Sequence, residues 1–174
     1  VKEAVGGTGG AGIGSGAGDG FDHLYVYKTN AHVTIKNATV EVAKSDSPSK
    51  SNTYGAGIGG GSKGSGGTIT IHGGNVTAQG GLSGAGIGGG ALGTGDVSIE
   101  GNVTIENAQG GAGAAGIGGG AETEPDTEDT RNKVSIKSTE AGSPDITATG
   151  GGASDGSLPG AAAIGSGSVA QQRP

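Results

Sequence analysis

The sequence predicts an all-β fold, a right-handed parallel β-helix (β-solenoid) of about four coils with three short strands in each coil. One short glycine-rich motif returns five times, and two runs of alternating apolar and polar residues separate successive copies. Glycine makes up 44 of the 174 residues, but only 5 are proline and no every-third-residue rule is followed, so collagen is excluded. Apolar residues that recur in register also argue against a disordered chain.

The repeated motif sets the period of the solenoid. It reads AGIGSG or AGIGGG four times and AIGSG once. Its isoleucines are Ile13, Ile58, Ile87, Ile117 and Ile164. The intervals between them are 45, 29, 30 and 47 residues, which indicates a base period of 29 or 30 with insertions in the first and fourth intervals.

The alternating runs predict two further strands in each coil. The first run reads VTI, TITI, VSI and VSI, and the second reads TVEV, NVTA, NVTI and DITA. Because strands in successive coils lie about 4.8 Å apart, the apolar residues should form inward ladders beside the isoleucines of the motif. The two further ladders are expected to be Ile35, Ile71, Ile99 and Ile136, and then Val40, Val76, Val103 and Ile146.

The outward residues give an independent test of this register. Two columns are expected to flank the first strand: His32, Thr68, Asp96 and Lys133, and then Lys36, His72, Glu100 and Lys137. They place Asp96 beside Lys133 and Glu100 beside Lys137, as neighbouring strands require. The second strand is expected to carry an outward column of Glu41, Thr77, Thr104 and Thr147.

The glycines are expected to have two different roles. The pairs that begin at Gly80, Gly110 and Gly150 follow the second run, where a corner of positive φ would favour glycine. Alternation along the motif instead predicts an outward strip of bare backbone that a ligand could approach closely. This docking strip consists of Gly57, Gly59, Gly86, Gly88, Gly116 and Gly118.

Residues 1–174 are expected to form a single module with surface insertions at 17–30, 44–54, 122–132 and 150–160. All four aromatic residues, Phe21, Tyr25, Tyr27 and Tyr54, lie in the first two insertions. They are candidates for stacking on a sugar ring, although aromatic side chains that cover bare backbone and cap the first coil would look the same.

Metal binding has weak support in the sequence. Asp19 and Asp22 offer oxygen ligands for calcium around a short turn, but the nonapeptide calcium repeat is absent and a plain polar turn explains them equally well. His32 and His72 fall in different columns, so a transition-metal site is not expected. No other cofactor is expected.

Charge and composition exclude several classes of partner. A net charge of −6 argues against nucleic acid, which needs clustered Lys and Arg. No apolar run approaches the roughly 20 residues that cross a bilayer, so membrane insertion is not expected. The absence of cysteine excludes disulfides and thiolate chemistry.

The segment GAGIGGG, with GGTITIHGGNVTAQGG, resembles the repetitive β-helix segments of large cell-surface proteins from Gram-positive gut and soil bacteria. The resemblance extends from Gly9 to Ser168. Several such proteins are described as carbohydrate-binding or adhesin-like. The resemblance implies an extracellular module, at the cell surface or secreted, which is part of a longer chain with neighbouring domains and has a glycan or a host surface protein as its partner.

The sequence favours a non-catalytic structural or adhesive role over an enzyme. The alternative is a substrate-binding β-helix of a polysaccharide-degrading enzyme, in which Asp96 and Glu100 would be the carboxylates nearest a sugar. Each of them faces a lysine in the next coil, as an exposed charge ladder would. Ice binding is disfavoured because Glu41 interrupts the single threonine column.

Overall fold

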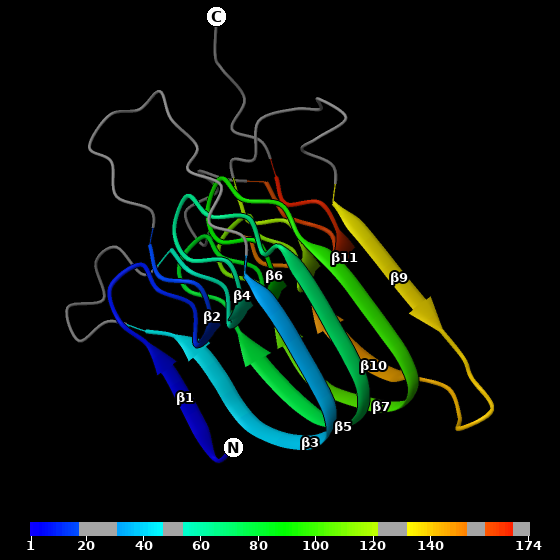
Figure 1. The fold of residues 1–174 in the computed structure, drawn as a ribbon. Helices are drawn as coiled ribbons and strands as arrows, with labels where there is room; N and C mark the ends of the chain where they lie inside the picture. Colours follow the sequence, from blue (N-terminus) through cyan, green and yellow to red (C-terminus); the bar gives the residue numbers. More distant parts are fainter. Residues whose placement is uncertain (18–30, 47–53, 122–131, 153–158, 169–174) are drawn as a thin grey trace, which may run out of the picture.

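A computed structural model describes residues 1–17, 31–46, 54–121, 132–152 and 159–168. These residues form strands and turns without any helix, arranged as a parallel β-helix (Figure 1). The strands are β1 (Glu3–Gly6), β2 (Ile13–Gly14), β3 (His32–Ser45), β4 (Ile58–Gly59), β5 (Thr68–Gln79), β6 (Ile87–Gly88), β7 (Asp96–Gln109), β8 (Ile117–Gly118), β9 (Lys133–Lys137), β10 (Asp145–Thr149) and β11 (Ile164–Gly165).

Two parallel sheets run along the stack. The long strands follow the order β1-β3-β5-β7, after which β9 and β10 both pair with β7. The two-residue motif strands form the second sheet in the order β2-β4-β6-β8-β11. The first coil therefore contains β3 and β4, the second β5 and β6, the third β7 and β8, and the fourth β9, β10 and β11. β1 and β2 form a partial coil that precedes the first and pairs with it.

The two alternating runs of each coil were expected to form separate strands, and in the first three coils they form one bent strand. Figure 1 shows β3, β5 and β7 turning from one face of the stack to another. The bend lies at Asn37, Gly73 and Gly101, whose φ values are 46°, 72° and 75°. Positive φ turns the chain cheaply at glycine and at asparagine, so the corner forms without an insertion. In the fourth coil a small turn closed by Thr139 and Gly142 separates β9 from β10 instead.

The core consists of stacked β-branched side chains, as the repeat predicts. Ile58, Ile87 and Ile117 are fully buried, and their amides donate hydrogen bonds of 2.9–3.0 Å to carbonyls of the next coil. The ladder Ile35, Ile71, Ile99 and Ile136 is confirmed by the strand register. Ile136 and Ile164, at the fourth-coil end, are each 42% exposed.

The third predicted ladder is confirmed at Val40 and Val76 but misplaces Val103, and the threonine column is wrong in register. Val76 pairs with Ile105 rather than with Val103, and Ile105 pairs with Ile146. Thr104 pairs with Asn75 and Asp145, so it does not align with Thr77 and Thr147. The cause is that β7 has two more residues than β5, and the register shifts once after His72 and again after Val76 to accommodate them.

Candidate functional site

A groove follows the corner at which the long strands end. Lys44, Gln79, Gln109 and Thr149 are partners in register at this end of four successive coils. The preceding residues Ala43, Ala78 and Ala108 are fully buried. Because side chains alternate along a strand, this burial directs the next residue in each coil outward.

Glycine forms the floor of the groove because backbone packs on backbone there. The amides of Gly80 and Gly110 each donate a 2.9 Å hydrogen bond to the next coil, to the carbonyls of Gln109 and Thr149. A Cβ on Gly80 would collide with the carbonyl oxygens of Gly84 and Ala85. The prediction of positive φ at Gly80, Gly110 and Gly150 is wrong, since close approach rather than φ requires glycine here.

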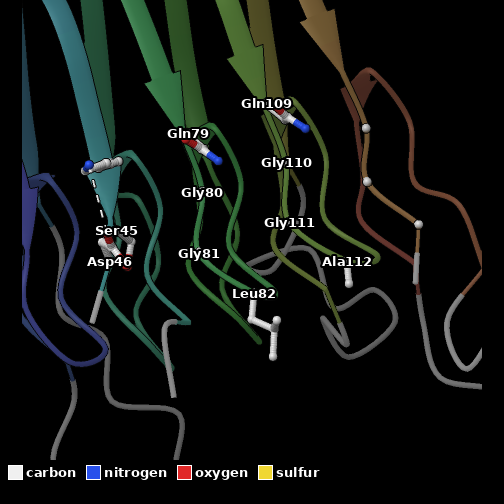
Figure 2. A pocket seen from close by; sticks show the side chains of 14 residues that line it. Ser45, Asp46, Gln79, Gly80, Gly81, Leu82, Gln109, Gly110, Gly111 and Ala112 are labelled. Carbon is white, nitrogen blue, oxygen red and sulfur yellow. Dashed lines mark ion pairs between the residues drawn. The ribbon is translucent and has the colours of Figure 1, made fainter. Parts of the chain in front are cut away.

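The groove has a volume of about 620 Å³ and spans the four coils. Figure 2 shows Gln79 and Gln109 projecting side by side from adjacent coils, with Leu82 and Ala112 further along the same two turns. Gln79 and Gln109 are exposed, and Leu82 is 52% exposed. The groove therefore combines amide donors and acceptors with the apolar side chains of Leu82 and Ala112.

The first-coil end of the groove is charged. Lys44 Nζ lies 3.0 Å from Glu3 Oε1 and 3.9 Å from Asp46 Oδ2. The hydrogen bond and negative charge of Glu3, helped by the charge of Asp46, raise the pKa of Lys44 above its usual value. Lys44 and Ser45 belong to β3, so the insertion expected at 44–54 begins later than predicted.

The glycines of the docking strip were expected to face outward, and this expectation is wrong. Gly57, Gly59, Gly86, Gly88, Gly116 and Gly118 are all buried. A Cβ on Gly57 would lie 2.6 Å from the amide nitrogen of Gln79 and 2.8 Å from the carbonyl oxygen of Ala43. The simple alternation of a strand fails here because each two-residue motif strand packs its backbone against the end of a long strand.

Most of the predicted aromatic and calcium residues lie outside the described part of the chain. These are Phe21, Tyr25, Tyr27, Asp19 and Asp22. Tyr54 is described: it is half-buried, and its carbonyl accepts a 2.7 Å hydrogen bond from the amide of Ala91. Among the described residues no three His, Cys, Asp or Glu side chains come together as a group that could hold a metal ion.

Asp96 and Glu100 occupy the charge columns that the sequence predicts. Asp96 pairs in register with Lys133, and Glu100 pairs with His72 and Lys137. Glu100 Oε2 lies 3.7 Å from His72 Nδ1, and its Oε1 lies 3.9 Å from Lys137 Nζ and accepts a 3.0 Å hydrogen bond from Ser98 Oγ. The Glu100 carboxylate is therefore held by neighbouring strands.

Sequence reasoning missed Gln79 and Gln109 as site residues, although a signal was present. Both stand in the tetrapeptide AQGG, which recurs at Ala78 and at Ala108. A buried alanine before the glutamine and a backbone-packed glycine after it point the amide outward at the same corner of two successive coils. If the corner of each coil is assigned to the two glycines of AQGG, the repetition predicts that the two glutamine amides lie side by side.

Comparison with known proteins supports the fold. A family model described as "Beta helix repeat" matches residues 33–62 and 69–91, which cover β3 with β4 and β5 with β6 except for the first residue of each long strand. Each match thus corresponds to one coil of the parallel β-helix. No match is found among curated proteins or among solved structures. In the described part of the chain no helix is long and apolar enough to cross a membrane.

Proposed function

We propose that the chain is a non-catalytic structural module of an extracellular surface protein, and that it holds a hydroxyl-rich chain such as a glycan in the groove beside Gln79 and Gln109. The observation that carries this proposal is the pair of exposed amides in register above a glycine floor. The extracellular setting rests on the resemblance of the GAGIGGG repeat to bacterial cell-surface proteins.

The chemistry of the groove suits a polymer of hydroxyl groups. A glutamine amide both donates and accepts hydrogen bonds, as a sugar hydroxyl does, and the side chain of Leu82 offers an apolar contact. The two amides recur at the strand spacing of about 4.8 Å, so a ligand extended along the stack would meet equivalent groups in successive coils. An elongated ligand therefore fits better than a compact one.

The geometry of the carboxylates supports a non-catalytic role. Asp96 and Glu100 are four residues apart on one strand, a separation of roughly 13 Å at about 3.3 Å per residue. Glycoside hydrolases place their two carboxyl groups about 5–9.5 Å apart. Glu100 is also engaged by His72, Lys137 and Ser98. This pair is therefore poorly arranged for glycosidic cleavage.

A glycan array tests the groove directly. We expect binding of extended polysaccharides by the wild-type chain and at least about tenfold weaker binding by the double variant Gln79→Ala, Gln109→Ala. Two lost hydrogen bonds of about 0.5–1.5 kcal/mol each are enough for that change. The matched control is Asn75→Ala, Thr104→Ala, a polar pair in register on the same two strands but outside the groove.

Two results would contradict the proposal. Equal binding by the two double variants would mean that the ligand does not use the groove. Release of reducing ends or unsaturated products from a bound polysaccharide, abolished by Asp96→Asn or Glu100→Gln, would favour the alternative role in a polysaccharide-degrading enzyme.

A further inference from the structure

In the described part of the chain, the strands of the fourth coil are paired on one side only. β9 and β10 each pair with β7 alone, and β11 pairs with β8 alone. β9 is the strand whose outward residues carry a repeated charge. Its inward residue Ile136 is 42% exposed, whereas Ile35, at the same position of the first coil, is 7% exposed. Ile164 in the motif strand of the same coil is also 42% exposed. The apolar interior is therefore accessible at the fourth-coil end.

The outward charges of β9 define what this edge could accept. Lys133 and Lys137 flank Ser135 along the strand. On its paired side β9 meets β7, where Asp96 lies beside Lys133 and Glu100 beside Lys137. Between these charges the apolar residues match, with Val97 beside Val134 and Ile99 beside Ile136. The β7–β9 contact thus shows that KVSIK accepts DVSIE as a parallel neighbour.

We propose that the free edge of β9 binds a parallel β-strand from a partner protein, with apolar residues at its two inward positions and an acidic residue at each end. Backbone hydrogen bonds would provide affinity, and the lysines would select the acidic ends. The inward residues of such a strand would cover Ile136. This edge is separate from the groove, because no residue of β9 lines the groove.

A second copy of this chain is the wrong occupant on grounds of topology and charge. At the other end of the stack β1 and β2 already pair with β3 and β4, so head-to-tail stacking would set β10 and β11 against β1 and β2 and offer β9 no described strand. Antiparallel pairing of two β9 edges would bring Lys133 opposite Lys137. Like charges on neighbouring strands oppose that pairing, and edge lysines commonly prevent it.

NMR titration of the labelled chain with short capped peptides tests the proposal. We expect GDVSIEG, which copies residues 95–101, to shift the amide signals of Lys133–Lys137 at millimolar concentration and to slow their exchange with solvent. The basic peptide GKVSIKG should bind at least about tenfold more weakly, since two favourable charge pairs become repulsive.

The charge-neutral variant Lys133→Gln, Lys137→Gln provides the matched test on the protein side. It should weaken binding of GDVSIEG several-fold and abolish the preference over GKVSIKG, while signals of β3, which does not contact β9, stay unchanged and report an intact fold. The proposal is overturned by equal binding of the two peptides to the wild-type chain, by shifts that avoid β9, or by none. Concentration-dependent self-association through β9 in sedimentation experiments would overturn it as well.

Discussion

Within each repeat, isoleucine fills the interior and the glycines on either side of it allow backbones to meet. Ile87 is fully buried between identical residues of the neighbouring coils. A Cβ on Gly86 would lie 2.7 Å from both the amide nitrogen of Gln109 and the carbonyl oxygen of Gly116. The narrow core therefore depends on one branched side chain in each motif and on glycines, which have no side chain, at the two positions next to it.

Replacing Ile87 with aspartate should unfold the solenoid. The carboxylate would be buried without a partner, so we expect a loss of more than about 4 kcal/mol in the free energy of unfolding. Thr34→Asp is the control, because Thr34 is exposed on β3, between the outward residues His32 and Lys36. We expect this variant to change the free energy of unfolding by no more than about 0.5 kcal/mol. Thermal melts of the two variants measure the difference, and similar melting temperatures would refute the inward assignment of Ile87.

Gly88→Ala should destabilise the chain even though the side chain added is small. Gly88 has a φ of 139°, and a Cβ there would collide with the carbonyl oxygen of Gly118. Backbone strain alone should cost about 1–3 kcal/mol. Gly7→Ala is the matched control, since its Cβ would meet no atom within 4 Å, and we expect it to be neutral or stabilising by up to about 1 kcal/mol. Chemical denaturation compares them, and equal stabilities would rule out the tight packing.

At the scale of strands, the register depends on features that the repeat pattern does not show. The ladders of Ile58, Ile87 and Ile117 and of Ile71 and Ile99 follow from period-2 alternation within a fixed period, so the sequence predicts them. The pairing of Val76 with Ile105 does not, because extra residues in β7 are absorbed as bulges whose positions depend on three-dimensional packing.

The same limit applies to the site. Outward placement of Gly57 and Gly86 follows from alternation, but alternation assumes a strand whose two faces differ. A two-residue strand pressed against the backbone of Gln79 or Gln109 has no free outer face. The glutamine pair could have been found from the repeated AQGG, whereas the groove could not, since its floor depends on contacts between corners of different coils.

Deleting single residues from β7 should separate bulged from regular positions. Glu106 and Asn107 together face the single residue Thr77 in β5 and the single residue Thr147 in β10. Deletion of Glu106 would remove this bulge with respect to both neighbours and leave only the shift after His72, so we expect a folded chain with stability within about 2 kcal/mol of the wild type.

Deletion of Ser98 is the contrasting case. It lies in a regular stretch, where a slip of one residue would turn Val97 or Ile99 toward solvent. We expect this variant to lose cooperative unfolding. Circular dichroism melts of both deletions test the register, and a deletion of Glu106 that is as damaging as that of Ser98 would contradict the bulge assignment.

At the scale of the whole molecule, stability should vary along the stack, because each coil contacts only its neighbours. The second and third coils have a coil on both sides, and Ile71, Ile87, Ile99 and Ile117 are fully buried. The fourth coil has only the third coil beside it among the described residues, and its Ile136 and Ile164 are each 42% exposed. The first coil is flanked by β1 and β2 as well as by the second coil, and its Ile35 is only 7% exposed, so the fourth coil is the less protected of the two.

Hydrogen exchange should reveal this inequality as a gradient of local unfolding. Amides of β5 and β7 should exchange only when the whole chain unfolds, whereas those of β9 and β11 should exchange through opening of the fourth coil alone, with lower protection. In the half of β3 that begins at His32, the amides should have protection close to that of the second and third coils, because Val33 and Ile35 are buried. Uniform protection of all four coils would instead mean that the solenoid unfolds as one unit and that the exposed isoleucines do not weaken its end. Addition of an acidic strand peptide should raise protection in β9 selectively, because it would supply the missing neighbour.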